Sequence, residues 1–163
     1  MTGGTCGALV LIMISIMITQ SRGLRVRHQP GKHASFDHMI LGTGIDIIEV
    51  ARIRTSIERF GERFYQRILR PAEIEYCLKF KHPAPHIAAR FAAKEAISKA
   101  FGTGIGRELS WQDMEIGRET GGKPFVILHG GGMLLLESRA GRIVHVSLSQ
   151  TENYATAIAI LES

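Results

Sequence analysis

Two residues of opposite charge, Glu95 and Lys99, are the strongest candidates for chemistry in this sequence. They lie four positions apart in an alanine-rich stretch, and on a helix that spacing places both side chains on one face. Ala88 and Ala92 occupy the preceding turns of that face, so we expect room for a ligand beside the charged pair. The same spacing is also typical of an ordinary solvated salt bridge, worth about 0.3–0.5 kcal/mol. The helix alone does not decide between the two.

Asp46 and the glycine-rich loop 102–106 are further candidates, and each has a plain structural interpretation as well. Asp46 ends a short glycine-containing strand, where a carboxylate could bind a ligand or simply cap the helix that follows. The loop begins with Gly102 and Thr103 and could cradle a phosphate. It lacks the Lys-Ser/Thr pair of a P-loop, however, and it follows a helix where that motif precedes one. A helix stop with a flexible turn is the better independent interpretation of the loop.

A polar strand face completes the set of candidates. Polar and apolar residues alternate over 142–150, so His145, Ser147 and Ser149 project from one face of the expected strand. That face could line a site for phosphates and a nucleotide, or it could simply be exposed to solvent. A hydrolase triad is not indicated, because no acid can be assigned to His145 and Ser147.

The elements that must position these residues are helices in the middle of the chain with strands around them. The spacing of apolar residues and the turn residues between them predict helices at 49–60, 64–69, 71–81, 86–101 and 131–140, and strands at 40–46, 113–119, 124–128, 142–150 and 154–161. The helix at 86–101 is the most regular, and Gly102 follows it as a stop signal. This order predicts an α+β domain with a small, mostly antiparallel sheet and a long central helix.

The net charge of +5 raises the alternative of a basic nucleic-acid-binding module, with the arginines of residues 52–70 as a phosphate patch. Part of that charge lies elsewhere. Four basic residues and one acidic residue fall within residues 1–38, which leaves the rest of the chain nearly neutral. The chain also lacks an aromatic stacking motif. Both features argue against the nucleic-acid alternative.

The first 38 residues are expected to form an N-terminal extension outside the folded domain, which we place at 39–163. The apolar run at 6–18 is shorter than the roughly 20 residues that span a bilayer, and no basic residues precede it as in a signal peptide. We therefore expect no stable membrane insertion and favour Met39 as the initiator, with a genuine tail or a weak membrane anchor as alternatives. The two cysteines suggest no disulfide framework, so the cytoplasm is the expected location.

Taken together and in this order, five short motifs resemble those of the holo-acyl-carrier-protein synthase family of phosphopantetheinyl transferases. They are GTGID at 42–46 with Arg52 six residues on, RFAAKEA at 90–96, GTGIG at 102–106, GKP at 122–124 and HVSLS at 145–149. The resemblance covers about three-quarters of the chain, from Met39 to the C-terminus. It implies a phosphopantetheinyl-transferase-like α+β fold and an enzyme of fatty acid biosynthesis. Such an enzyme moves phosphopantetheine from coenzyme A to a serine of apo-acyl carrier protein and releases adenosine 3′,5′-bisphosphate.

The resemblance also implies the residues of the site. Asp46 and Glu95 would bind Mg²⁺, and Glu95 and Lys99 would be the catalytic residues. This fits the chemistry, because Mg²⁺ prefers one or two carboxylates with phosphate oxygens and water, and a metal and a lysine can together neutralise a pyrophosphate under attack. Proton removal from the serine would fall to Glu95 or to a metal-held water. The implied coenzyme A contacts are Arg90, Lys99, Gly102, Thr103 and His145.

Expectations about protein partners follow from the same resemblance. Arg52, Arg63 and Arg67 would form the docking surface for an acidic carrier protein, although they could also be solvated charges balanced by nearby glutamates. A homotrimer with active sites between subunits is expected. The chain departs from the family at Gln150, where a histidine is usual. Glutamine does not titrate near neutral pH, so that position offers no acid–base group here.

Overall fold

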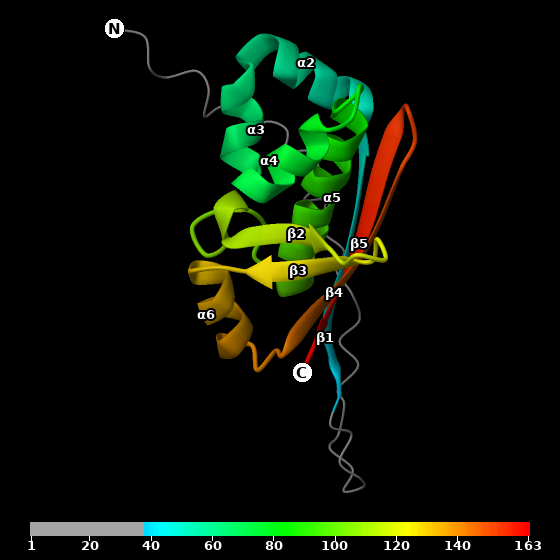
Figure 1. Ribbon diagram of the computed structural model, residues 1–163. Coiled ribbons are helices and arrows are strands. Elements are labelled where there is room, and N and C mark those ends of the chain that lie inside the picture. Colours follow the sequence, from blue (N-terminus) through cyan, green and yellow to red (C-terminus); the bar gives the residue numbers. More distant parts are fainter. Residues whose placement is uncertain (1–37) are drawn as a thin grey trace, which may run out of the picture. The chain divides into compact units, whose positions relative to one another are not determined.

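The elements form where the local sequence favours them, and together they make the α+β domain that the apolar pattern predicts (Figure 1). The structure is a computed structural model, and it describes residues 38–163. In chain order the elements are β1 (Ile40–Glu49), α2 (Val50–Phe60), α3 (Glu62–Ile68), α4 (Pro71–Leu78), α5 (Ala84–Phe101), the 3₁₀ turn η1 (Trp111–Asp113), β2 (Met114–Arg118), β3 (Pro124–Leu128), α6 (Gly131–Ser138), β4 (Ile143–Gln150) and β5 (Tyr154–Glu162). Most boundaries lie within a few residues of those expected. Helix α4 ends at Leu78 and not near residue 81.

The strands form two antiparallel sheets. Strands β1, β5 and β4 make a three-stranded sheet with β5 in the centre, so the first and last strands of the domain are neighbours. The Ser163 N–H donates to the Met39 carbonyl oxygen at 2.9 Å, which extends this pairing to the last residue. Strands β2 and β3 form a separate hairpin, whose turn includes Gly122 at a φ of 86° that glycine adopts readily.

Helix α5 lies at the centre of the domain. It packs along one face of the three-stranded sheet, while α2, α4 and β2 contact its other sides (Figure 1). The approach of α5 to β1 is so close that only glycine fits at two positions. A Cβ at Gly42 would collide with the carbonyl oxygen of Ala100, and a Cβ at Gly44 with that of Ala96. The relative placement of the helix and the strand is therefore tightly fixed.

The small residues of α5 serve this packing and not a ligand. Room for a ligand beside Ala88 and Ala92 is expected from the sequence, but both residues are completely buried in the hydrophobic core. That expectation is wrong because alanine side chains here let backbones approach one another at the close packing typical of protein interiors. Glu95 and Lys99, together with Phe91 one turn earlier on the same side of the helix, keep part of their surface exposed.

One face of the three-stranded sheet is covered by α5, and the other is open. Side chains alternate along β1, so Ile45 and Ile47 are exposed on the open face. Ile158 of β5 pairs with Ile45 on one side and with Ser147 of β4 on the other, and His145 projects from the same face. The predicted polar face of β4 is confirmed. It forms part of a mixed surface that we call the open sheet face.

The predictions for the N-terminal extension fall almost entirely on residues outside those described, so the domain boundary at residue 39 stays a prediction. Among residues 38–163, no helix is both long enough and apolar enough to cross a membrane. The first described strand starts at Ile40, directly after Met39.

Candidate active site

Asp46 lies on the covered face of β1, where the strand passes along α5. Its side chain is 6% exposed, and its Oδ1 accepts a hydrogen bond from Lys99 Nζ at 2.8 Å. The same ammonium donates to the Ile45 carbonyl oxygen at 3.0 Å. Asp46 is not the N-cap of α2, because Glu49 occupies that position. The carboxylate therefore belongs to a charged group shared between strand and helix, and the capping interpretation is excluded.

Glu95 lies one helical turn before Lys99 and interacts electrostatically with Asp46. Burial raises the pKa of Glu95 to about 7, the negative charge of Asp46 adds to this shift, and the charge of Lys99 opposes it. Burial also raises the pKa of Asp46, against the hydrogen bond and positive charge of Lys99. Two carboxylates and one ammonium thus share a largely buried site, in which the negative charge is incompletely balanced.

The two carboxylates fit a small, hard divalent cation. Mg²⁺ takes one or two carboxylates and completes its shell with water and phosphate oxygens. Within residues 38–163, no group of three or more His, Cys, Asp or Glu side chains could hold a metal by itself. A cation at Asp46 and Glu95 would therefore depend on water or substrate for its other ligands. It would also relieve the repulsion that contributes to the raised pKa of Glu95.

Gly102 and Thr103 lie where α5 ends, about one turn beyond Lys99. Gly102 has a φ of 75°, the left-handed conformation expected for a helix stop. Its N–H donates to the Lys99 carbonyl oxygen at 3.0 Å, and the Thr103 N–H donates to that of Ser98 at 3.2 Å. These two backbone donors are therefore occupied within the chain. Their coenzyme A contacts stay predictions, supported by their position next to Lys99.

Arg90 and His145 are not brought to the carboxylates within one chain. The Arg90 side chain is 2% exposed, and its guanidinium carbon lies 4.2 Å from the centroid of the Tyr76 ring. Its Nε has no hydrogen-bond partner among the described residues. His145 projects from the open sheet face, opposite to Asp46, and its Nε2 lies 2.8 Å from Glu162 Oε2. The predicted coenzyme A contacts of both residues stay predictions.

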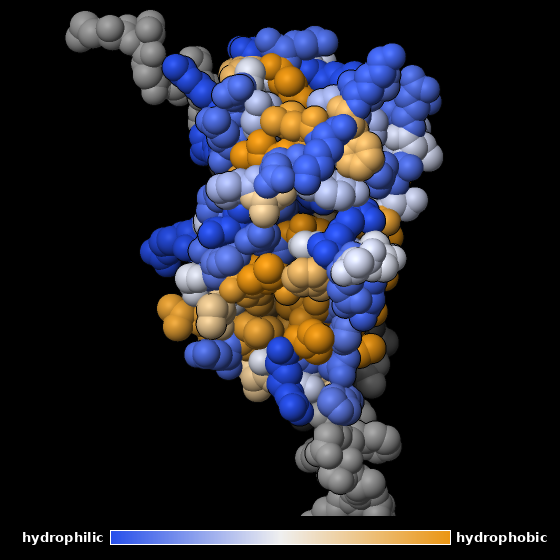
Figure 2. Space-filling model, viewed as in Figure 1, coloured by the Kyte–Doolittle hydropathy of each residue, from blue (hydrophilic) through white to orange (hydrophobic). Residues whose placement is uncertain are grey.

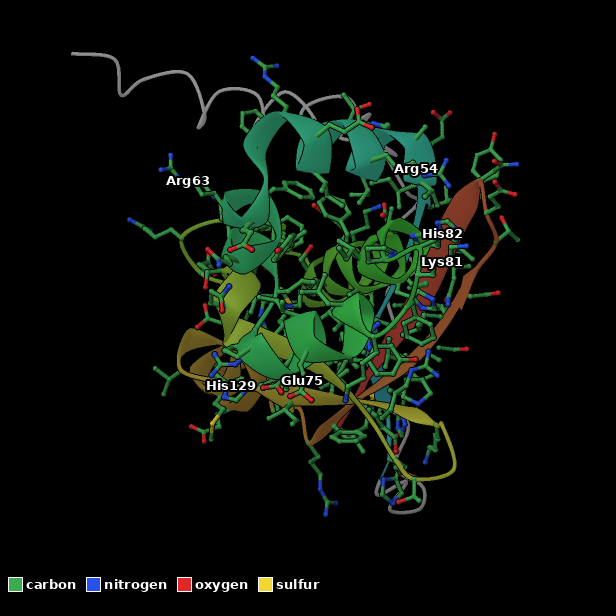
Figure 3. The ribbon with its side chains drawn as sticks, turned by 45° about the horizontal axis from the view of Figure 1, so that its top comes forward. Arg54, Arg63, Glu75, Lys81, His82 and His129 are labelled. Carbon is green, nitrogen blue, oxygen red and sulfur yellow. The ribbon has the colours of Figure 1, made fainter. Side chains whose placement is uncertain are left out.

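The three predicted docking arginines are exposed on two neighbouring helices, α2 and α3. Arg52 lies in the first turn of α2, close enough to Asp46 for its charge to oppose the rise in the Asp46 pKa. Arg63 and Arg67 lie four residues apart on the exposed side of α3, and Arg63 projects outward (Figure 3). The surface over α2 and α3 is largely hydrophilic in Figure 2. This arrangement is compatible with docking, which stays a prediction.

Two polar residues that the sequence did not single out hold the surroundings of the site together. Lys94 is completely buried, and its Nζ donates to Glu73 Oε2 at 2.7 Å and to the carbonyl oxygens of Ile68 and Trp111. Burial lowers the pKa of Lys94, and the carboxylate of Glu73 opposes that shift. The second residue is Gln112, in the turn before β2, whose side-chain amide contacts the backbone at the end of α3. No local spacing reveals the contacts of Lys94 and Gln112, because each joins segments distant in the sequence.

Comparisons with known proteins agree with this geometry. A model of the 4′-phosphopantetheinyl transferase superfamily matches residues 42–159. The holo-[acyl-carrier-protein] synthase of Koribacter versatilis is 53% identical over 124 residues, which cover 76% of this chain and 99% of that protein. The solved structure of the Neisseria meningitidis synthase has a TM-score of 0.72 at 36% identity, covering 77% of this chain and 100% of that one. The Helicobacter pylori synthase, solved in complex with coenzyme A, has a TM-score of 0.66 at 35% identity, covering 73% and 98%.

The chain thus belongs to the 4′-phosphopantetheinyl transferase superfamily, and within it to the holo-[acyl-carrier-protein] synthases. The family, the fold and the enzyme class that the five motifs predict are confirmed. The nucleic-acid-binding alternative finds no support in these similarities.

Proposed function

We propose that this protein transfers phosphopantetheine from coenzyme A to a serine of apo-acyl carrier protein, as a step of fatty acid biosynthesis. The products would be holo-acyl carrier protein and adenosine 3′,5′-bisphosphate. The observation that carries the proposal is the cluster of Asp46, Glu95 and Lys99 in a member of this family. We expect the reaction in the cytoplasm, and the free, buried thiol of Cys77 is compatible with a reducing compartment.

Asp46 and Glu95 are the proposed ligands of Mg²⁺. When bound, the cation would neutralise negative charge on the pyrophosphate of coenzyme A while the serine attacks. The donor set supports this assignment, because two hard carboxylate ligands meet in a largely buried site. Ionised carboxylates are unfavourable there, since burial first and the charge of Asp46 second raise the pKa of Glu95 to about 7. Binding of a divalent cation would favour the ionised form of both groups.

Lys99 is the proposed second positive group. Its ammonium is held at 2.8 Å from Asp46, yet a third of the side chain remains exposed, with 34% accessible to solvent. It can therefore contact a phosphate oxygen that enters beside the carboxylates and stabilise charge on the leaving bisphosphate. The proton of the serine hydroxyl would pass to Glu95 or to a water held beside it. A carboxylate kept ionised beside the cation is able to accept a proton.

The activity can be tested directly with the purified chain. Coenzyme A, apo-acyl carrier protein and Mg²⁺ should together give holo-carrier, detected as a mass increase of one phosphopantetheine, and an equal amount of adenosine 3′,5′-bisphosphate. A carrier with its acceptor serine changed to alanine is the matched control. Omission of Mg²⁺, with a chelator present, tests the metal separately. Absence of product with every carrier of a panel would overturn the proposal, and full activity with the chelator would overturn only the metal assignment.

Arg52, Arg63 and Arg67 are proposed to dock the acidic carrier protein. Their exposure on α2 and α3 supports this, as does the hydrophilic character of that surface (Figure 2). Helix α2 follows directly after β1, so the docking surface is connected to the strand that carries Asp46. Opposite charges on two proteins mainly raise the rate of encounter and fix their orientation.

We also propose that the chain assembles as a homotrimer through the open sheet face. Ile45 of the edge strand β1 is 65% exposed, and its pairing partner on the central strand β5, Ile158, is 42% exposed. An apolar sheet face of this kind is typical of a surface that is covered in the assembled protein. His145 lies on the same face, so assembly there would bring it to a neighbouring subunit. This offers a physical basis for its predicted contact with coenzyme A.

A further inference from the structure

The C-terminal end of α3 is held by two side chains from distant parts of the chain. Gln112 Nε2 lies within hydrogen-bond distance of three carbonyl oxygens, those of Gln66 at 3.0 Å, Arg67 at 3.1 Å and Leu69 at 3.0 Å, so its two hydrogens are shared among three acceptors. Lys94 Nζ donates to the remaining carbonyl oxygen of this turn, that of Ile68, at 2.7 Å. The four consecutive carbonyl groups of residues 66–69, at and just beyond the end of the helix, thereby have side-chain donors from one glutamine and one lysine.

Helix α3 depends on these contacts more than most helices do. The last carbonyl groups of a helix have no partner within it, and many helices satisfy them with a left-handed glycine. Here the residue after the helix, Leu69, has a φ of −117° and a ψ of 150°, so the chain leaves in an extended conformation without that cap. With only seven residues, α3 is also too short to be stable alone. Its position must therefore be set from outside.

The same contacts join α3 to the helix of the active site. Lys94 directly precedes Glu95 in α5, and its ammonium also bonds Glu73 Oε2 and the Trp111 carbonyl oxygen. The turn that carries Gln112 is held in addition by Arg70, whose guanidinium donates to the Gln112 carbonyl oxygen at 2.8 Å. A continuous chain of hydrogen bonds therefore runs from the end of α3 to the residue next to the candidate catalytic carboxylate.

We propose that Gln112 is a positioning residue for the carrier protein. By holding the end of α3 it fixes Arg63 and Arg67 at a set distance from Asp46 and Glu95, so that a docked carrier presents its serine to the site. This inference rests on the proposed carrier docking and adds to it a residue that touches neither substrate. Its effect should appear in the use of the carrier protein and leave coenzyme A binding unchanged.

The test compares two glutamines of this region. Gln112→Met keeps the size of the side chain but removes both donors. Gln66→Met is the matched control, because the Gln66 side chain is exposed and its one side-chain hydrogen bond within residues 38–163 goes to Glu62, at 3.4 Å. We expect Gln112→Met to raise the KM for apo-carrier about fivefold to tenfold, since small displacements of docking groups have large kinetic effects. The KM for coenzyme A and kcat at saturating carrier should stay within about twofold, and the control should behave as the unchanged protein.

Two further variants keep the result interpretable. Gln112→Asn retains the donors but is shorter by one methylene group, so it should show a smaller effect in the same direction. It replaces Gln112→Met in the test if that variant proves unstable.

Arg67→Glu tests the docking surface itself. If Arg67→Glu raises the carrier KM while both Gln112 variants leave it unchanged, the positioning role is wrong and docking stands. If neither arginine reversal, at Arg63 or Arg67, has an effect, the docking proposal fails and this inference fails with it. If kcat/KM falls by the same factor for coenzyme A and for apo-carrier, Gln112 has a general structural role and the inference is overturned.

Discussion

At the scale of single residues, the two carboxylates of the site differ in how their charge is balanced. Asp46 has the Lys99 ammonium at 2.8 Å, and the charge of Arg52 opposes the effect of burial on its pKa. Glu95 has a pKa raised to about 7 by burial and by the charge of Asp46. Environments that separate the pKa values of neighbouring groups are typical of sites where protons move at neutral pH. Glu95 is therefore the group whose protonation state responds to pH.

The first prediction concerns stability and pH in the absence of divalent cations. The pKa of Glu95 is 4.5 in its ordinary state and about 7 in the folded protein, so the folded state binds more protons between these values. The free energy of unfolding must then fall as pH rises through this window, by up to about 3 kcal/mol. Glu95→Gln cannot titrate, so above pH 7 it should be more stable than the unchanged protein. Chemical denaturation at pH 5 and pH 8 with a chelator measures this. Glu75→Gln, at an exposed position, is the control.

The second prediction concerns activity. Asp46→Ala and Glu95→Ala should each lower kcat/KM by about 100-fold or more, because each removes a ligand for the cation that neutralises the pyrophosphate. Both variants should remain folded by circular dichroism. Glu75→Ala removes an exposed carboxylate that pairs with exposed Lys79, and it should leave activity unchanged. Near-normal turnover of either site variant at saturating Mg²⁺ and substrate would contradict the assignment.

At the scale of elements, the close approach of β1 and α5 places Asp46 beside Glu95 and Lys99. Gly42 and Gly44 face the backbone of α5, and the alanines of the helix complete the contact. The strand supplies one carboxylate and the helix supplies the other carboxylate and the lysine. A change in the spacing of these two elements would therefore separate the three groups.

The third prediction tests this spacing. Gly44→Ala places a methyl group against the carbonyl oxygen of Ala96, so it should lower the free energy of unfolding by about 2–4 kcal/mol. Activity should fall further than stability alone explains, because β1 would move away from α5. Gly121→Ala is the matched control, since a Cβ there meets nothing within 4 Å. Equal stability of the two variants in urea denaturation would show that the approach is not tight.

The fourth prediction concerns α3. Arg63→Glu and Arg67→Glu should each raise the KM for apo-carrier about tenfold at low salt and leave the KM for coenzyme A nearly unchanged. The unchanged protein at sub-saturating carrier should slow as ionic strength rises, and the variants should lose part of that dependence. Steady-state kinetics at several salt concentrations provide both measurements. Unchanged carrier KM and salt dependence in both variants would exclude this surface as the docking site.

The sequence predicts the elements well, but it does not predict the contacts between distant residues. The apolar period and the stop at Gly102 place α5 correctly, and the alternation of β4 identifies its exposed face. Family motifs lead to Asp46 and Glu95. The Lys94–Glu73 ion pair and the contacts of Gln112 link segments that meet only in the folded chain, so no local spacing can reveal them. The expectation of a ligand space beside the α5 alanines is wrong for the same reason, because their burial depends on distant segments that pack against them.

At the scale of the whole molecule, the open sheet face is a surface of exposed apolar and polar side chains on the side of β1 opposite to Asp46. It combines the exposed isoleucines of β1 and β5 with the polar residues of β4. Burial of one isoleucine side chain contributes about 1.5–3 kcal/mol. Several of them in one contiguous face would give the proposed assembly a substantial driving force.

The fifth prediction follows from this surface. Light scattering should return the mass of a trimer for the purified chain, and Ile45→Asp or Ile158→Asp should shift it toward the monomer, because each would bury a charge in the interface. Leu134→Asp is the matched control, since Leu134 is an exposed apolar residue of α6 away from the sheet. The monomeric variants should also lose affinity for coenzyme A if His145 acts across the interface. A fully active monomer at low concentration would count decisively against assembly through this face.

The pairing of β1 with β5 has a consequence for how the enzyme is made. Of the described elements β1 leaves the ribosome first during synthesis, but its only strand partner among them is the last one, β5. Asp46 pairs in register with Ala157, so this carboxylate is among the first site residues to be synthesised and among the last to be fixed in place. Joining the two strands closes a loop that includes nearly the whole domain, and such long-range pairing is slow. A nascent chain that lacks β5 therefore contains every catalytic residue proposed here, but it cannot form the sheet that places Asp46 beside Glu95.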